Sequence, residues 1–333
     1  MEKWLETLCT LDGTSGDEGS VRDYILSQIE GFCEVRIDAL GNIIAKKKGK
    51  KTPKNRIMLD AHMDEVGVIA KYVTDDGFIK FSTVGGINTE CLLAQRVRFG
   101  SVRGVIGIKP THLLSKDEQK KLPDADGLYI DIGAKDKAEA LSLISLGDFG
   151  VFDSEYIKSD DIICSKAIDD RAGCAMLIKL LRSDAEYDFY ATFTVQEEVG
   201  TRGAGCAAFS VEPDYCICLE STTASDIAGV DGENRVCLLG GGPVLSFMDR
   251  STVYDREMFK TATECGVKWQ PKTAVAGGNN GSAIQRSGRG VRTLAISIPC
   301  RYLHSASCVA SLSDMENAYN LCVAMLSRLG DRE

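Results

Sequence analysis

The stretch 56–65 reads Arg56-Ile57-Met58-Leu59-Asp60-Ala61-His62-Met63-Asp64-Glu65, an apolar strand over 56–59 followed at once by polar side chains. Three later apolar runs also end in charged residues or a histidine. In open α/β sheets, sites form in the crevice outside the carboxyl ends of the strands. We therefore predict an α/β fold with a site at this edge. The later strands and the residues after them are 190–195 with Glu197 and Glu198, 215–219 with Glu220, and 293–298 with Arg301 and His304.

The pattern changes after this stretch. Residues 66–159 contain short β-like runs separated by glycine turns, with one helical stretch near 137–143. We predict a discontinuous α/β catalytic domain, residues 1–65 and 161–333, interrupted by a small β domain at 66–160. The expected strands of the insertion are 68–72, 78–81, 97–99, 105–108 and 128–131.

Helical periodicity marks three segments of the larger domain. Val21, Ile25 and Ile29 are spaced as on one face of a helix. A mostly buried helix is expected over 171–182. The last helix is expected over 313–329, with either Ser311 or Ser313 as its N-cap.

The composition excludes several kinds of partner. The chain has 333 residues, 44% hydrophobic and 26% charged, as in ordinary globular proteins. Its net charge of -9 argues against nucleic acid, because phosphate backbones attract basic surfaces. No apolar run approaches the ~20 residues of a membrane span, and the start lacks a signal-peptide pattern. The thirteen scattered cysteines are then expected as reduced thiols in the cytoplasm.

Histidines and acids at the strand ends are candidates for a metal centre. Two of the three histidines, His62 and His304, lie beside carboxylates or at a loop start. Imidazole and carboxylate both bind zinc-like ions, at about 2.0–2.2 Å. Two ions about 3.5–4 Å apart repel each other, so a shared carboxylate is needed, and Asp169 is our choice. The candidate metal ligands are His62, Asp169, Glu198, Glu220 and His304.

Three neighbouring acids have other expected roles. Glu197 adjoins the ligand Glu198 and can face the attacking water as general base, because adjacent side chains diverge. Asp64 lies two residues after His62, where it could orient the imidazole through a hydrogen bond. Asp170 is explained equally well as an N-cap of the helix that follows or as a member of the site.

Four segments resemble the motifs of the M42 metallopeptidases, the family of tetrahedral, deblocking and glutamyl aminopeptidases. They span the chain in the family's order, and the insertion falls where the family has its β domain. The resemblance implies a phosphorylase/hydrolase-like catalytic domain, with a mixed sheet sandwiched by helices, and an inserted PDZ-like domain that makes dimer contacts. The segments are Ala61–Gly67, Ala167–Gly173, Gln196–Ala204 and Ile298–Ser305.

The resemblance also implies the activity. It would be a dinuclear metallo-aminopeptidase that removes the N-terminal residue of short peptides. Zn²⁺ and Co²⁺ are the first candidates for the two ions of each subunit and Mn²⁺ the third, since all tolerate such ligands. Six dimers typically close into a hollow dodecamer. One ion would be held by His62, Asp169 and Glu220, and the other by Asp169, Glu198 and His304, with Glu197 as base and Asp64 as orienter.

Two positions depart from the family pattern. Glu220 stands where the family usually has an aspartate, which lengthens this ligand by one methylene. Asn280 replaces an acid in the segment Ala276–Gly281, which loses one negative charge.

Two other functions remain open at this point. A glycosidase, a name that some family members carry, would need two carboxylates about 5–9.5 Å apart and no metal. A chelator separates it from a metallopeptidase. A non-catalytic shell protein would be expected to lack the base or a ligand, whereas this chain has all of them.

Overall fold

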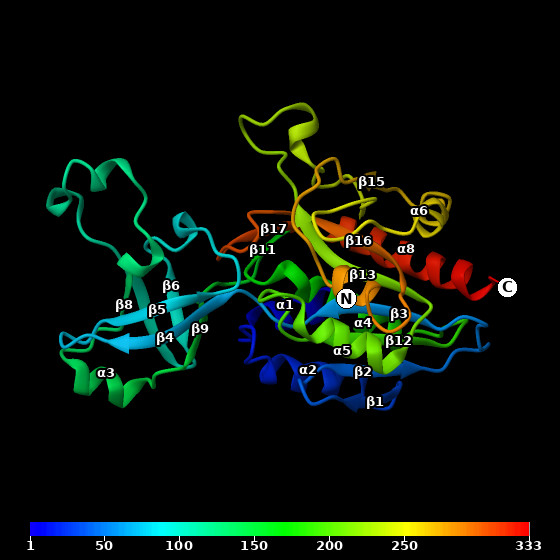
Figure 1. Cartoon of the computed structure of the whole chain (residues 1–333), viewed down its shortest axis with the longest axis horizontal. Coiled ribbons are helices and arrows are strands. Elements are labelled where there is room, and N and C mark those ends of the chain that lie inside the picture. Colours follow the sequence, from blue (N-terminus) through cyan, green and yellow to red (C-terminus); the bar gives the residue numbers. More distant parts are fainter. Residues whose placement is uncertain (333) are drawn as a thin grey trace.

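The computed structural model describes residues 1–332, which form a broad α/β body with a small β-barrel beside it (Figure 1). An 11-stranded sheet forms the centre of the body, so the predicted mixed α/β class is confirmed. Its main path runs β1 (Glu34–Ile37), β2 (Ile43–Lys47), β12 (Phe189–Thr194), β3 (Ile57–His62), β13 (Tyr215–Thr223), β16 (Arg292–Arg301), β17 (Cys308–Ser311), β11 (Ile162–Ser165) and β10 (Ile157–Ser159). Two short strands, β14 (Val244–Leu245) and β15 (Gln270–Pro271), lie beside β16 and β14 respectively.

The middle of this sheet is parallel. Strand β3 pairs in parallel with β12 and β13, and β13 pairs in parallel with β16. All residues of β3 are buried, as is typical of parallel strands that are covered on both faces. The carboxyl ends of these strands therefore meet at one edge.

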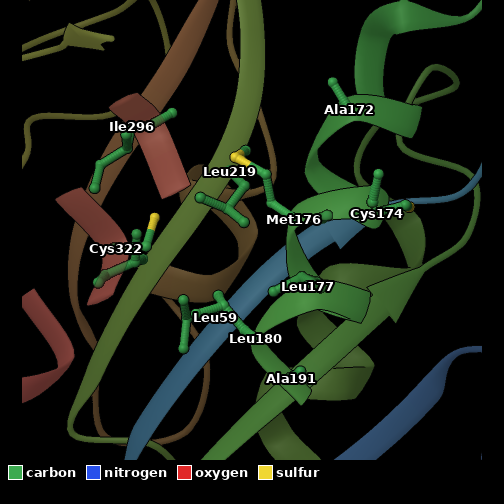
Figure 2. Packing of buried hydrophobic residues seen from close by; sticks show 14 of the residues in the cluster. Leu59, Ala172, Cys174, Met176, Leu177, Leu180, Ala191, Leu219, Ile296 and Cys322 are labelled. Carbon is green, nitrogen blue, oxygen red and sulfur yellow. The ribbon is translucent and has the colours of Figure 1, made fainter. Parts of the chain in front are cut away.

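Helices cover both faces of the sheet, because alternate side chains of each strand point to opposite sides. Leu59 belongs to the same buried cluster as Met176 and Leu177 of α4 (Figure 2). Its neighbour Met58 belongs to a second cluster, with Ala204 of α5. The helices of the body are α1 (Glu2–Thr10), α2 (Gly19–Ile29), α4 (Ile168–Leu181), α5 (Arg202–Val211), α6 (Arg256–Thr263), α7 (Gly281–Gln285) and α8 (Leu312–Gly330).

The second part is a closed barrel with a core of its own. Its strands fall within the predicted insertion, whereas β10 belongs to the large sheet. The domain boundaries and the PDZ-like relationship stay predictions, and Glu333 lies outside the described residues. In barrel order the strands are β4 (Gly67–Val73), β5 (Ile79–Val84), β8 (Tyr129–Asp131), β7 (Val102–Gly107), β6 (Arg96–Phe99) and β9 (Phe149–Phe152). Helix α3 (Lys137–Leu143) packs beside β4, and five short 3₁₀ turns are η1 (Thr89–Cys91), η2 (Thr111–Leu113), η3 (Glu118–Lys120), η4 (Ala125–Gly127) and η5 (Gly232–Arg235).

Three strands continue further toward their carboxyl ends than predicted. Strand β3 includes His62, β13 continues beyond Glu220, and β16 continues to Arg301. Glu220, for example, still pairs with Ser297 of the neighbouring strand. The backbone ladder persists wherever a neighbouring strand is present, so the polarity of the side chains did not mark the strand ends.

The predicted helices are confirmed, with small shifts. Helices α4 and α8 match the two late predictions, and Ser311 is the N-cap of α8, since its Oγ accepts a 3.2 Å hydrogen bond from the N–H of Asp314. The predicted face of α2 is buried. Helices α1, α5, α6 and α7 were not predicted. Within residues 1–332, none of the helices combines the length and apolar character that a membrane span requires.

Candidate metal centre

The five predicted metal ligands come together at the carboxyl edge of the parallel strands. His62 ends β3, and Glu220 lies in β13. Glu198 follows β12, Asp169 lies in the first turn of α4, and His304 lies in the loop between β16 and β17. Two triads of these residues have ligand atoms within 4.8 Å of one another.

The first triad, here called the inner site, consists of His62, Asp169 and Glu220. Nε2 of His62 lies 3.5 Å from Oδ1 of Asp169 and 3.8 Å from Oε2 of Glu220. The side chains of His62 and Glu220 are only 1% and 5% exposed. The longer glutamate therefore still reaches the imidazole, in spite of its extra methylene.

The second triad, here called the outer site, consists of Asp169, Glu198 and His304. Nε2 of His304 lies 3.3 Å from Oε2 of Glu198 and 3.8 Å from Oδ2 of Asp169. The His304 side chain is 34% exposed, so this site is closer to solvent than the inner one. Asp169 turns one carboxylate oxygen toward each imidazole, which is the arrangement that a bridging ligand requires.

Asp64 organises the residues around the inner site. Its Oδ1 lies 3.4 Å from Nδ1 of His62, and its backbone oxygen lies 3.1 Å from the same nitrogen. Its carboxylate also accepts hydrogen bonds from the backbone N–H groups of Glu197 and Glu198, at 3.0 and 3.1 Å. A further bond of 2.6 Å comes from Oγ of Ser15, a residue that the sequence analysis missed. Asp64 therefore contacts both the histidine and the turn that carries two acids.

Glu197 lies next to both sites. Its carboxylate falls within 4.8 Å of ligand atoms of His62 and Glu198, although neither main triad includes it. Burial, together with the charges of Asp169 and Asp64, raises the pKa of the Glu197 carboxyl to about 7, against the opposing effect of His62. A carboxyl with a pKa near 7 can exchange a proton at neutral pH.

The electrostatics of the cluster suit cations. Burial raises the pKa of both the Glu198 and Glu220 carboxyls, and the surrounding acids add to the shift. Burial lowers the pKa of His62, but hydrogen bonds to Asp169 and Asp64 outweigh it and raise this pKa well above its usual range. Within residues 1–332, the ion pairs of Asp169, Glu198 and Glu220 are with the two imidazoles. This mixed nitrogen and oxygen donor set fits two zinc-like divalent ions.

Asn280 is fully buried behind the inner site. Its Nδ2 donates hydrogen bonds of 2.7 Å to Oδ2 of Asp60 and 2.8 Å to Oγ1 of Thr194. Its backbone N–H lies 3.4 Å from Oε1 of Glu220. The amide at this position donates a hydrogen bond to Asp60, whereas a carboxylate here would repel the carboxylate of Asp60. The sequence pattern singles out Asn280 but does not indicate its partners.

A buried ionic cluster surrounds Glu65, the residue that follows Asp64 in the sequence. Nζ of Lys166 donates to Oε1 of Glu65 at 2.6 Å, and a guanidinium nitrogen of Arg171 donates to the same oxygen at 3.1 Å. Lys166 and Arg171 also donate to the backbone oxygens of Leu11 and Leu8. Both cations are almost completely buried, so they hold the chain before α2 against α4. This cluster was not predicted, because Lys166 and Arg171 are more than a hundred residues from Glu65 along the chain.

Two predicted polar residues lie outside the triads. Asp170 is a helix cap: its Oδ1 accepts a 3.0 Å hydrogen bond from the N–H of Gly173, and its Oδ2 lies 3.3 Å from the N–H of His62. Arg301 makes two 2.8 Å hydrogen bonds to Asp226. Among the described residues, neither belongs to a group that could hold a metal.

Comparison with known proteins gives a consistent result. The family model described as M42 glutamyl aminopeptidase matches residues 41–321. A relative from Acetivibrio thermocellus with an aminopeptidase name is 39% identical over 318 residues, which cover 93% of this chain and 94% of that protein.

Solved structures agree with the sequence matches. An aminopeptidase from the archaeon Desulfurococcus kamchatkensis superposes with a TM-score of 0.92 at 33% identity, covering 97% of this chain and 93% of that one. The Pyrococcus horikoshii TET1 peptidase, described as assembling into a tetrahedron or a large octahedral shell, has a TM-score of 0.84 at 33% identity. The alignment covers 97% of this chain and 98% of that chain.

Proposed function

We propose that this chain, which belongs to the M42 glutamyl aminopeptidase family, removes the N-terminal residue of short peptides with two divalent ions in each subunit. Membership makes the chain an aminopeptidase, a hydrolase that acts as an exopeptidase. The observation that carries the proposal is the position of Asp169, whose two oxygens face His62 at 3.5 Å and His304 at 3.8 Å.

The two triads divide the ligands between the ions. His62, Asp169 and Glu220 would hold one ion, and Asp169, Glu198 and His304 the other. When bound, such a pair of ions supplies Lewis acidity and lowers the pKa of coordinated water. Zn²⁺ and Co²⁺ are our first candidates and Mn²⁺ the third, since imidazole and carboxylate accept all three.

Glu197 is the proposed general base. Its carboxylate lies within reach of both triads, and burial holds its pKa at about 7. It would take a proton from the attacking water and deliver it to the leaving amine. The hydrogen bond from its backbone N–H to Asp64 fixes the turn that carries it, and Asp64 also orients His62.

Membership in an aminopeptidase family favours a peptide with a free N-terminus as the substrate. The four acids of the cluster would be offset by two divalent ions, so their charge does not by itself select an α-ammonium group.

The two alternatives are less well supported. A glycosidase needs two carboxylates and has no use for two inward-facing imidazoles, whereas His62 and His304 face the acids here. A non-catalytic shell protein is at odds with membership in an aminopeptidase family and with the presence of Glu197.

The relatives support a proposal for the assembly. We propose a homo-oligomer in which the inserted segment 66–160 makes dimer contacts and dimers close into a dodecamer. The shells described for the Pyrococcus horikoshii TET1 peptidase support this proposal. A cytoplasmic location also stays a proposal.

A chelation experiment tests the function. The protein is treated with EDTA, dialysed, and assayed on a panel of aminoacyl p-nitroanilides with Zn²⁺, Co²⁺ or Mn²⁺ added back. We expect no turnover without metal, recovery with at least one ion, and a preference among side chains. Full activity after verified metal removal would contradict the two-ion proposal.

A further inference from the structure

We infer that the barrel turn Gly85-Gly86 positions the two outer ligands, Glu198 and His304, so that the outer ion is held only while the barrel is docked on the large sheet. The inference rests on the proposed two-ion centre. Gly85 and Gly86 directly follow β5, which ends at Val84. In Figure 1, the strand β17 that follows the His304 loop lies on the side of the sheet nearest the barrel.

The first contact orients the imidazole. Nδ1 of His304 lies 2.7 Å from the backbone oxygen of Gly86, which leaves Nε2 to face Glu198. A hydrogen bond to the second ring nitrogen fixes the tautomer and the ring direction of a metal-binding histidine. His304 also has a φ of 58°, a conformation that most residues avoid and that surrounding contacts must hold. The histidine of the outer site is therefore oriented by the barrel.

The second contact fixes the acid. Gly85 has a φ of +83°, and a Cβ built on it would lie 2.8 Å from Cγ1 of Val66 and 3.2 Å from Cβ of Glu198. The backbone of the turn therefore packs directly on the first side-chain atom of an outer ligand. Only glycine combines this backbone conformation with so close an approach.

A third contact anchors the loop that carries His304. Ala306 belongs to the buried cluster of the barrel, together with Phe152 of β9. Oγ of Ser154 donates a 2.6 Å hydrogen bond to the backbone oxygen of Ala306. The loop is thus fastened to the barrel two residues after the ligand.

The inner ligands have supports that lie outside the barrel strands, in the loop after β3 and at the start of α7. His62 contacts Asp64, and Glu220 lies 3.4 Å from the backbone N–H of Asn280. A small shift of the barrel should therefore weaken the outer site and leave the inner site intact.

The test compares two glycines of the barrel. Gly85→Ala adds a methyl group against Glu198, whereas Gly133→Ala, at a φ of +78° with no atom within 4 Å of the added Cβ, carries only the backbone cost. Each full-length variant is titrated with Zn²⁺ in a calorimeter after chelation, and bound zinc is counted after dialysis. We expect two ions in the wild type and in Gly133→Ala, and an outer affinity at least about tenfold weaker in Gly85→Ala with the inner affinity unchanged.

A milder pair covers the case in which Gly85→Ala does not fold. Ser154→Ala removes the bond to the His304 loop, and Ser142→Ala removes an exposed bond within α3, from Oγ to the backbone oxygen of Glu139. Only the first should weaken the outer ion. Wild-type affinity for both ions in Gly85→Ala, or in Ser154→Ala if Gly85→Ala does not fold, overturns the inference and leaves the proposed function standing. A wild type that binds fewer than two ions overturns the proposed function, and this inference with it.

Discussion

The carboxylate of Asp64 lies against the imidazole of His62, with Oδ1 3.4 Å from Nδ1, and both side chains are almost completely buried. Burial raises the pKa of Asp64, but hydrogen bonds and the charge of His62 outweigh it and lower this pKa below the usual value. Asp64 is therefore ionised at neutral pH. As an ionised acceptor, it holds the histidine with Nε2 turned toward Asp169 and Glu220.

Asp64→Asn should weaken metal binding. The NH₂ group of the new amide must replace either Oδ1, which faces the imidazole and the N–H of Glu197, or Oδ2, which accepts from the N–H of Glu198. In either position it places a donor against a donor. Loss of such a supporting group typically costs about 10–100-fold in metal affinity. Calorimetric titration measures this, with the exposed Asp23→Asn as control. Unchanged affinity would show that Asp64 does not orient His62.

Glu197→Gln should separate catalysis from metal binding. The amide keeps the shape of the side chain but cannot accept the proton, and general acid–base catalysis is worth about 10²–10⁴ in rate. We expect kcat to fall within that range while two ions stay bound. The exposed Glu264→Gln is the control. Wild-type turnover in Glu197→Gln would exclude it as the base.

Asp60 should make stability depend on pH. Burial raises its pKa from 3.8 to about 6, although Thr192 and Asn280 donate hydrogen bonds to it. The folded protein therefore keeps this proton at a pH where the unfolded chain has lost it. The contribution of Asp60 to the free energy of unfolding should fall as pH rises from about 4 to about 6, by on the order of 3 kcal/mol, and then stay constant.

Asp60→Asn tests this pH dependence, because the amide cannot titrate but can still accept a hydrogen bond from Asn280. The free energy of unfolding of both metal-free proteins is measured with urea at several pH values. Plotted against pH, it should fall more steeply in the wild type than in Asp60→Asn between about pH 4 and pH 6, and the two plots should run parallel above about pH 6. Curves that stay parallel across the whole range would rule out a raised pKa for Asp60.

Removal of the ions should destabilise the fold. An ion that binds only the native state adds about 2.7 kcal/mol at a free concentration of 100 times its Kd. We expect chelation to lower Tm by several degrees and added Zn²⁺ or Co²⁺ to restore it, by differential scanning calorimetry. An identical Tm with and without bound metal would contradict a native-state metal site.

Glu65→Gln should be among the most destabilising changes. It leaves the buried cations of Lys166 and Arg171 without their carboxylate, and breaking such a cluster typically costs about 3–5 kcal/mol. Glu186→Gln breaks an exposed pair with Lys51 and should leave the free energy of unfolding nearly unchanged, because water screens such pairs. Equal free energies of unfolding for the two variants would show that the buried cluster stabilises the fold no more than the exposed pair does.

Local patterns in the sequence were sufficient for the main elements. The apolar run at 56–59 and the mostly buried stretch at 171–182 predict β3 and α4, because burial on both faces leaves few polar positions. The polar residues after the strands pointed to the ligands, since parallel strands end at one edge of a sheet. Helix α1 was missed, although it buries Leu5 and Leu8. The long extension of β16 was also missed, because strand ends depend on neighbouring strands.

The sequence by itself determined which side chains were available as ligands, acids and bases, and roughly where the strands that carry the site and the helices α2, α4 and α8 would form. Only the tertiary structure decided how they are supported: Gly86 beside His304, Ser15 beside Asp64, and Asn280 beside Asp60. These pairs are separated by between 49 and 220 residues along the chain. Side-chain periodicity reports only on the nearest few residues, whereas these contacts depend on how distant elements pack in space.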